Sequence, residues 1–264
     1  MSAARMPSLY LPHGGGPSFF MSGPRKQRYQ ATEDFLRGVH TLLATPPQAI
    51  LLVSAHWETE VPAFTGGERP GLIYDYSGFP PETYQLRYDA PGAPALAQRA
   101  CALLRQAGHA ARVDPERGWD HGVFIPLKVM FPEADIPVVA MSLQRGLEPG
   151  LHCDFGRALR PLRDEGVLVI GAGMSYHNLM DFEAHAADSF AFHDWLDEAL
   201  AGGHEQRRER LSLWHDAPGG RASHPREEHL LPLMVASGAG SESGARRLWR
   251  GSVGPTCLGA WAFD

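Results

Sequence analysis

Residues 49–58 read AILLVSAHWE, an unbroken apolar run that ends close to a histidine, His56. Isoleucine, leucine and valine in a continuous run, rather than alternating with polar residues, are typical of a strand that is buried on both faces. Such strands occur in α/β sheets, where helices cover both faces of the sheet. Runs of the same kind predict further strands at 8–11, 136–141, 167–170 and 258–263.

Helix-like segments separate these apolar runs, at 93–107, 151–164, 189–201 and 228–236. The first has Pro94 in its first turn and Gly108 just beyond its end, an arrangement common in helices. The last must kink or begin late, because Pro232 lies inside it. No stretch has the composition of an interdomain linker, and no internal repeat is found. The sequence therefore predicts an α/β fold, a single compact domain over residues 1–264 with a central mostly parallel or mixed β-sheet and helices on both faces.

Composition narrows the class of protein. The chain has 264 residues, 44% of them hydrophobic, and a formal net charge of −6 without a long basic run. Nucleic acid and anionic membrane surfaces are therefore not expected as partners. No stretch approaches the ~18 apolar residues of a membrane span, and the N-terminal stretch lacks the apolar core of a signal peptide. Cys101, Cys153 and Cys257 form no CxxC pair, which favours a reducing, cytoplasmic location. The sequence does not indicate an oligomeric state.

Three of the thirteen histidines lie near the ends of predicted strands. His13 follows SLYLP, His56 follows AILLVSA, and His177 comes shortly after VLVIGAG. In open α/β sheets, ligands bind outside the carboxyl ends of the strands. If these strands are parallel, the three imidazoles meet in one cleft, whereas antiparallel strands would scatter them. Imidazole is the commonest metal ligand and also carries protons near neutral pH, so the pattern indicates a metal or catalytic site.

Two more histidines stand in helix-like contexts, His121 in GWDHGVFIPLKVMFP and His229 in HPREEHLLPLMVASGAG. Taken alone, a histidine of this kind is more often structural than functional. The glycines after His13 suit a tight turn, and a phosphate loop is disfavoured because neither GxxxxGK[ST] nor GxGxxG is present. The remaining histidines are expected to be structural or on the surface: His40, His109, His152, His185, His193, His204, His215 and His224.

Five segments in order then carry a family resemblance: LYLPHGGGP, LLVSAHWE, DHGVFIPLKVMFPEADIPVVAMSL, GAGMSYHNL and EEHLLPLMVASGAG. In combination they resemble the class III extradiol ring-cleavage dioxygenases, specifically the 4,5-DOPA extradiol dioxygenase type, from about residue 8 to the C-terminus. The resemblance implies one catalytic domain that uses Fe(II) and O₂. It also implies a small-molecule substrate, a DOPA-like or other catechol, whose ring is opened to a muconic semialdehyde-type product.

The resemblance also implies a role for each candidate histidine. His13, His56 and His229 correspond to the metal ligands of the family. His177 corresponds to the active-site histidine, which would take a proton from the catechol and later return one. His121 corresponds to a second histidine of the pocket, which would hydrogen-bond the substrate or stabilise developing negative charge.

The third metal ligand is the point where the sequence offers two choices. The wider class uses two histidines and a glutamate, and here Glu228 and His229 stand side by side. Successive helix residues differ by ~100° in direction, so only one would face a metal well. The segment EHLLPL matches the DOPA-type branch and selects His229. Whether His177 is itself a ligand, and whether Glu228 contributes, stays open. Three histidines also suit Zn(II), which is therefore an alternative bound metal.

Two other functions use the same pocket. A zinc-dependent hydrolase or amidase would take His177 or Glu228 as its base, although the HExxH motif is absent. A non-catalytic relative would bind metal without turnover. Arg87 could pair with a substrate carboxylate, but a surface arginine is the commoner case. Aromatic candidates for the pocket wall are Trp57, Tyr74, Tyr76, Phe79 and Tyr84.

Overall fold

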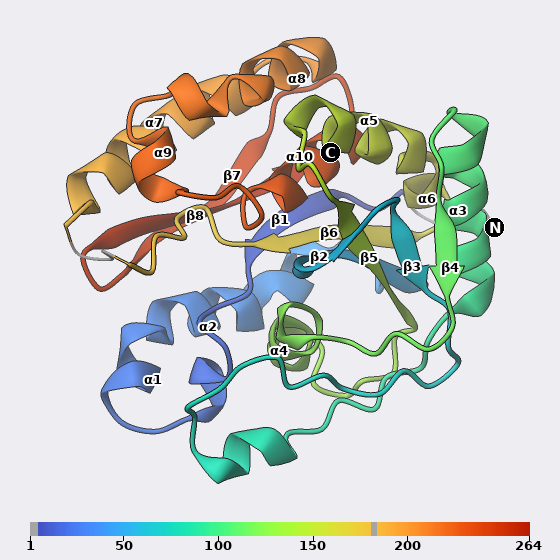
Figure 1. The fold of residues 1–264 in the computed structure, drawn as a ribbon, viewed down its shortest axis with the longest axis horizontal. Coiled ribbons are helices and arrows are strands. Elements are labelled where there is room, and N and C mark those ends of the chain that lie inside the picture. Colours follow the sequence, from blue (N-terminus) through green and yellow to red (C-terminus); the bar gives the residue numbers. More distant parts are fainter. Residues whose placement is uncertain (1–4, 181–183) are drawn as a thin grey trace.

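A computed structural model describes residues 5–180 and 184–264, and its centre is one mixed β-sheet (Figure 1). The strand order is β4-β3-β5-β2-β6-β1-β8-β7. The neighbours β5, β2, β6 and β1 are parallel to one another, whereas β8 pairs antiparallel with both β1 and β7. The predicted α/β fold is thereby confirmed in its mixed form. The strands are β1 (Ser8–Pro12), β2 (Ala49–Thr59), β3 (Ala63–Thr65), β4 (Arg112–Asp114), β5 (Val138–Gln144), β6 (Val167–Gly173), β7 (Arg246–Val253) and β8 (Thr256–Phe263).

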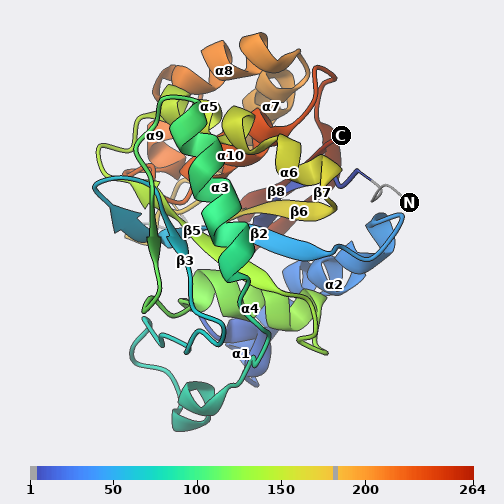
Figure 2. The same cartoon turned by 90° about the vertical axis from the view of Figure 1, so that its right-hand side faces the viewer.

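Both faces of the sheet are covered, which explains the continuous apolar runs. In β2, Leu51 and Val53 belong to one apolar cluster, and Ile50 and Leu52 belong to the other, on the opposite face. Figure 1 shows α5 and α7 to α10 on one side of the sheet and α1, α2 and α4 on the other. Figure 2 shows α3 running along the edge that carries β3 and β5. The helices are α1 (Pro24–Arg28), α2 (Gln30–Gly38), α3 (Pro94–Gln106), α4 (His121–Met130), α5 (Pro149–Leu159), α6 (Pro161–Asp164), α7 (Ala186–Leu200), α8 (His204–Ser212), α9 (Gly220–Ser223) and α10 (Leu231–Ala239).

Three predicted elements differ from those observed. The helix predicted over 151–164 is divided into α5 and α6 at Pro161, which has no N–H to continue the ladder. The last predicted helix begins late, at Leu231, with Pro232 in its first turn. Strand β2 continues past Val53 to Thr59, so His56 lies inside the strand rather than beyond it.

Several elements carry no clear sequence signal, because they are short or polar. Strands β3 and β4 have three residues each, and β7 is largely exposed. Residues 1–4, part of the stretch examined for a signal peptide, lie outside the described residues, as do 181–183. In the two described segments, no helix is both long enough and apolar enough to cross a membrane.

A buried histidine outside the pocket makes stability depend on pH. His152 is buried in α5, where its Nδ1–H donates to the Glu148 carbonyl at 2.7 Å and its Nε2 accepts from the Gln144 N–H at 3.1 Å. The bond accepted at Nε2 requires the neutral ring, because a protonated ring has no lone pair there. Burial lowers the pKa of His152 from 6.5 to about 4.

Acidification is therefore expected to destabilise the fold through His152. Below pH 6.5 the unfolded chain binds this proton and the folded chain does not, so stability is lost as the pH falls from about 6.5 towards 4. Between pH 7 and pH 5 the loss from this one residue is about 2 kcal/mol. Urea unfolding at both pH values measures it, and His152→Gln should show a smaller difference between them. An equal difference in this variant would contradict the assignment.

Candidate active site

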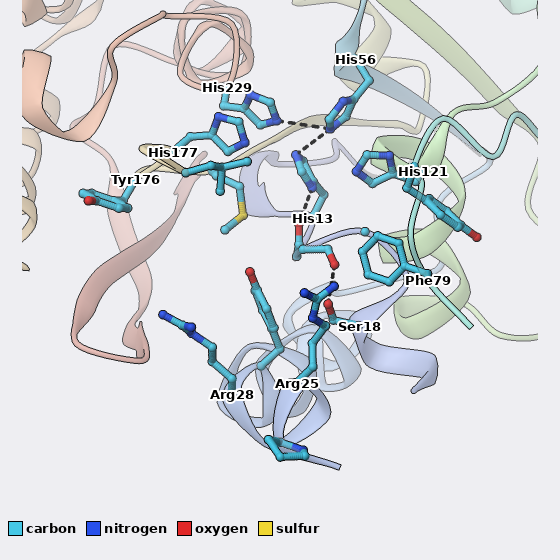
Figure 3. Close-up of a pocket in the computed structure, with 18 residues that line it drawn as sticks. His13, Ser18, Arg25, Arg28, His56, Phe79, His121, Tyr176, His177 and His229 are labelled. Atoms are coloured by element: carbon cyan, nitrogen blue, oxygen red, sulfur yellow. Dashed lines mark hydrogen bonds between the residues drawn. The ribbon is translucent and has the colours of Figure 1, made fainter. Parts of the chain in front are cut away.

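A cavity of about 700 Å³ opens at the carboxyl ends of the central strands and is lined by all five candidate histidines (Figure 3). Strands β2, β6 and β1 are adjacent and parallel. His13 follows the end of β1, and its N–H donates to the Gly173 carbonyl at 3.0 Å. His56 lies in β2 where the register with β5 shifts. His177 follows β6. The sheet therefore delivers these three imidazoles to one cavity.

His229 and His121 reach the same cavity from the two helical layers. His229 lies in the turn before α10, and its carbonyl accepts the Tyr10 hydroxyl and the Met174 N–H, both at 3.0 Å. His121 is the first residue of α4, which follows Asp120. Because β1 and β6 anchor the backbone of His229, its ring is held at the ends of the central strands.

Three of the rings point their Nε2 atoms at one another. Nε2 of His56 lies 3.3 Å from Nε2 of His13 and 3.2 Å from Nε2 of His229, the two contacts dashed in Figure 3. Two metal–nitrogen bonds of ~2.1 Å at ordinary tetrahedral or octahedral angles put their nitrogens about 3.0–3.4 Å apart. The spacing therefore fits three ligands of one ion.

The Nδ1 atoms of the three rings face oxygen atoms, which helps to turn each Nε2 towards the other rings. Nδ1 of His13 lies 2.8 Å from the Gly14 carbonyl, and Nδ1 of His229 lies 2.9 Å from Oε1 of Glu228. Nδ1 of His56 is 3.7 Å from Oδ2 of Asp75. With Nδ1–H donated to an oxygen, Nε2 of His13 and Nε2 of His229 each present a lone pair, which is the usual arrangement of metal-ligating histidines. The same tautomer of His56 directs its Nδ1–H towards Asp75. Three facing lone pairs repel one another and favour a cation between them.

The same rings are held in the neutral form that metal binding requires. Burial, followed by repulsion from His56, lowers the pKa of His13 well below its ordinary value, and burial with repulsion from His177 does so for His229. For His56, burial and then His121 lower the pKa to about 3. The donor set is therefore ready for a divalent ion at neutral pH.

Glu228 does not join this set. Its Oε1 faces the Nδ1 atoms of His229 and His177, at 2.9 and 3.5 Å. Burial alone would raise the pKa of Glu228, but the hydrogen bond with His177 lowers it. The sequence predicted a helix over 228–236, but Glu228 and His229 lie before the helix, because α10 begins at Leu231. Glu228 thus lies behind the two rings, and it orients them.

His177 and His121 flank the convergent trio. The ring of His177 stacks on that of His229, with centroids 3.3 Å apart. His121 lies beside His56 at 3.9 Å between centroids, and its Nδ1 is 2.8 Å from Oδ1 of Asp75. A nitrogen of His121 also lies within 4.8 Å of one each from His13 and His56. His121 is therefore the competing third ligand, although no Nε2 contact as short as that of His229 joins it to His56.

Glycines make this crowding feasible at two places. Gly14 and Gly16, directly after His13, have φ of +87° and +59°, which side chains rarely adopt. Gly122 leaves room for the neighbouring strand, since a Cβ there would lie 2.8 Å from Cδ2 of His56. The glycine run noticed in the sequence is thus a turn that shapes the cavity.

Some pocket residues were expected from the sequence and others were missed. Tyr76 and Phe79 line the cavity, whereas Arg87 is exposed and outside it. The other three aromatic candidates do not line it. Asp75 was missed because nothing in the sequence links an aspartate between two tyrosines to a histidine 46 positions away. Also missed were the wall residues Ser18, Arg25, Arg28, Tyr29, Met174, Tyr176 and Leu179.

The chain is similar to known proteins over most of its length. A family model described as the catalytic LigB subunit of aromatic ring-opening dioxygenase matches residues 7–256. A 4,5-DOPA dioxygenase extradiol from Portulaca grandiflora is 41% identical over 91% of this chain and 89% of its own. The protein of that name from Escherichia coli is 36% identical, over 90% and 87%. The dioxygenase tasH from Hapsidospora irregularis is 37% identical, over 89% and 78%.

A solved structure shares the fold. The crystal structure of an uncharacterized protein from Escherichia coli K12 superposes with a TM-score of 0.75 at 30% sequence identity, covering 98% of this chain and 100% of that one. The match of the family model spans strands β1 to β7 and all five histidine segments. The chain therefore belongs to the family of the catalytic LigB subunit of aromatic ring-opening dioxygenases, and it is an extradiol ring-cleavage dioxygenase.

Proposed function

We propose that this enzyme opens the ring of a DOPA-like catechol beside its two hydroxyls, with O₂ and Fe(II), to a muconic semialdehyde-type product. The observation that carries the proposal is the convergence of three Nε2 atoms at 3.2–3.3 Å in the wall of one cavity. The names of the relatives support the substrate class, since several are 4,5-DOPA dioxygenases. We further propose that residues 1–264 form one catalytic domain.

His13, His56 and His229 would hold the metal. Fe(II) with open coordination positions is the ion that non-haem oxygenases use to bring an organic substrate and O₂ together. The hydrogen bonds at Nδ1 of His13 and His229 fix these two rings before any ligand arrives, which reduces the cost of ordering the site. Because the three donors are all neutral, the site keeps the full positive charge of the ion to attract an ionising catechol.

His177 would move the proton of the substrate. Glu228 engages its Nδ1, so Nε2 is the ring nitrogen that remains for a ligand in the cavity. A carboxylate behind the ring stabilises the imidazolium that forms when Nε2 takes a proton from a catechol hydroxyl. The same nitrogen can later return the proton to an oxygen of the product. Imidazole is the side chain most often used for such transfers.

His121 would hydrogen-bond the substrate on the other side of the cavity. Asp75 engages its Nδ1 at 2.8 Å and also accepts its backbone N–H at 2.9 Å. These two bonds fix the ring without the entropy cost of ordering it during the reaction. With Nδ1–H given to Asp75, the fixed Nε2 would accept a hydrogen bond from a substrate hydroxyl, and once it has taken that proton its N–H would stabilise negative charge on a substrate oxygen.

Oxygen uptake tests the proposal. Protein loaded with Fe(II) without air is offered DOPA, caffeate and protocatechuate, and O₂ consumption is followed together with the absorbance spectrum. Uptake matched by a new semialdehyde-type absorbance band is the expected result. No uptake with iron verified as bound would overturn the proposal. Hydrolysis of an ester or amide by the Zn(II)-loaded protein without O₂ would favour the alternative zinc hydrolase, and metal binding without any turnover would favour a non-catalytic relative.

A further inference from the structure

The wall of the cavity opposite the histidines carries positive charge. Figure 3 shows Arg25 and Arg28, both from α1, on the side of the cavity away from the five imidazoles. Among the described residues that line the cavity, these two arginines are the only ones with a permanent charge. The nearby carboxylates, Asp75 and Glu228, engage histidine Nδ1 atoms instead. A ligand in the cavity thus meets a metal site at one end and guanidinium groups at the other.

Arg25 has no carboxylate partner within residues 5–180 and 184–264. Other arginines of the molecule are paired with carboxylates, such as Arg226 with Glu58 and Arg208 with Asp154, and the adjacent Lys26 pairs with Glu33. The guanidinium carbon of Arg25 instead lies 4.8 Å from the centre of the Phe79 ring. A cation held over an aromatic face keeps its N–H groups free for an anion.

Arg25 and the three convergent histidines line the same cavity. A Cβ at Gly16 would be 3.1 Å from Cζ of Phe79, so the ring beneath Arg25 rests on the glycine turn. Tyr29 also contacts the turn, since a Cβ at Gly15 would be 2.4 Å from its hydroxyl. Phe79, which lies under Arg25, and Tyr29 therefore both pack on the glycine turn that follows His13.

We propose that Arg25 binds a carboxylate on the side chain of the catechol, so that the enzyme selects catechols with a short acidic side chain over neutral ones. The inference rests on the proposed ring cleavage and adds the group that recognises the substrate. A guanidinium presents paired donors that match the two oxygens of a carboxylate. Because Arg25 is solvent-exposed, it contributes to affinity at the mouth of the cavity and does not take part in the reaction.

Steady-state kinetics of Arg25→Gln on two substrates tests this selection. With 3-(3,4-dihydroxyphenyl)propionate, KM is expected to rise about tenfold, the loss of one charge-assisted contact, with kcat nearly unchanged. With 4-methylcatechol, which has no carboxylate, KM should stay as in the wild type. Arg25→Lys keeps the charge and should recover part of the lost affinity. Arg87→Gln, an exposed arginine outside the cavity, is the matched control and should match the wild type with both substrates.

The outcomes separate this inference from the function on which it rests. An active enzyme whose Arg25→Gln variant treats both catechols as the wild type does would overturn the role of Arg25 and leave ring cleavage standing. Equal losses on both substrates would also overturn it, since they indicate a general disturbance of the site. Calorimetry with 3-phenylpropionate, which cannot be cleaved, provides a readout without turnover. Weaker binding to the variant than to the wild type supports the carboxylate contact even if no catechol is opened.

Discussion

His56→Ala is expected to lose its bound metal and more than ~10³-fold in ring-cleavage rate. His56 is the centre of the convergent trio, because its Nε2 contacts those of both His13 and His229. Without His56, only Nε2 of His13 and Nε2 of His229 remain, and the nitrogen that contacts both of them is gone. Even changes to groups that only orient a ligand cost ~10–100-fold in metal affinity or activity, so loss of the central ligand costs more. Metal analysis after gel filtration, together with O₂ uptake, measures both effects.

His121→Ala is the matched control for this experiment, since it removes a neighbouring imidazole that lies within 4.8 Å of the same site. It should retain the metal, because the two short Nε2 contacts do not include it. A His56→Ala protein with full metal occupancy would remove His56 from the ligand set. Loss of metal from His121→Ala with retention by His229→Ala would instead make His121 the third ligand.

His177→Ala is expected to keep its metal and to lose ~10²–10⁴-fold in kcat, the usual contribution of a positioned general acid–base group. The ring lies against His229 but contributes no nitrogen to the trio, so ligation should survive its removal. His177→Gln fills similar space without transferring a proton and should be similarly slow. Metal content and the dependence of kcat on pH are measured together, and unchanged turnover would refute the role.

The Glu228→Gln variant tests whether the loss in His177→Ala comes from a missing proton-transfer group or from a disturbed metal site. Its Oε1 faces both His177 and His229, so Glu228→Gln keeps the shape and weakens the stabilisation of a protonated His177. A smaller fall in kcat than that of His177→Ala, with the metal retained, is the expected result. Loss of metal from this variant would indicate that Glu228 acts chiefly by orienting His229.

Local chemistry explains why the sheet could be predicted. The run AILLV of β2 alternates between two apolar clusters, and a segment with no polar face can only be buried on both sides. The predicted helix over 93–107 agrees with α3, which has a proline in its first turn and ends at Gln106. Errors arose where one residue decides a boundary, as Pro161 does between α5 and α6. The elements that were missed are short or polar, and their stability comes from neighbours rather than from their own pattern.

What the sequence alone determined is the α/β class, the central buried strands and the three histidines near their ends, because burial and strand ends depend on residues that are close along the chain; the family resemblance added His121 and His229. That the central strands are parallel was decided by the tertiary structure. Only the tertiary structure decided which nitrogens meet, that Glu228 lies behind the rings, and that Arg25 faces them across the cavity. His56 is 43 positions from His13 and 173 from His229. Contacts over such separations depend on strand order and loop paths, which depend on the packing of the whole chain.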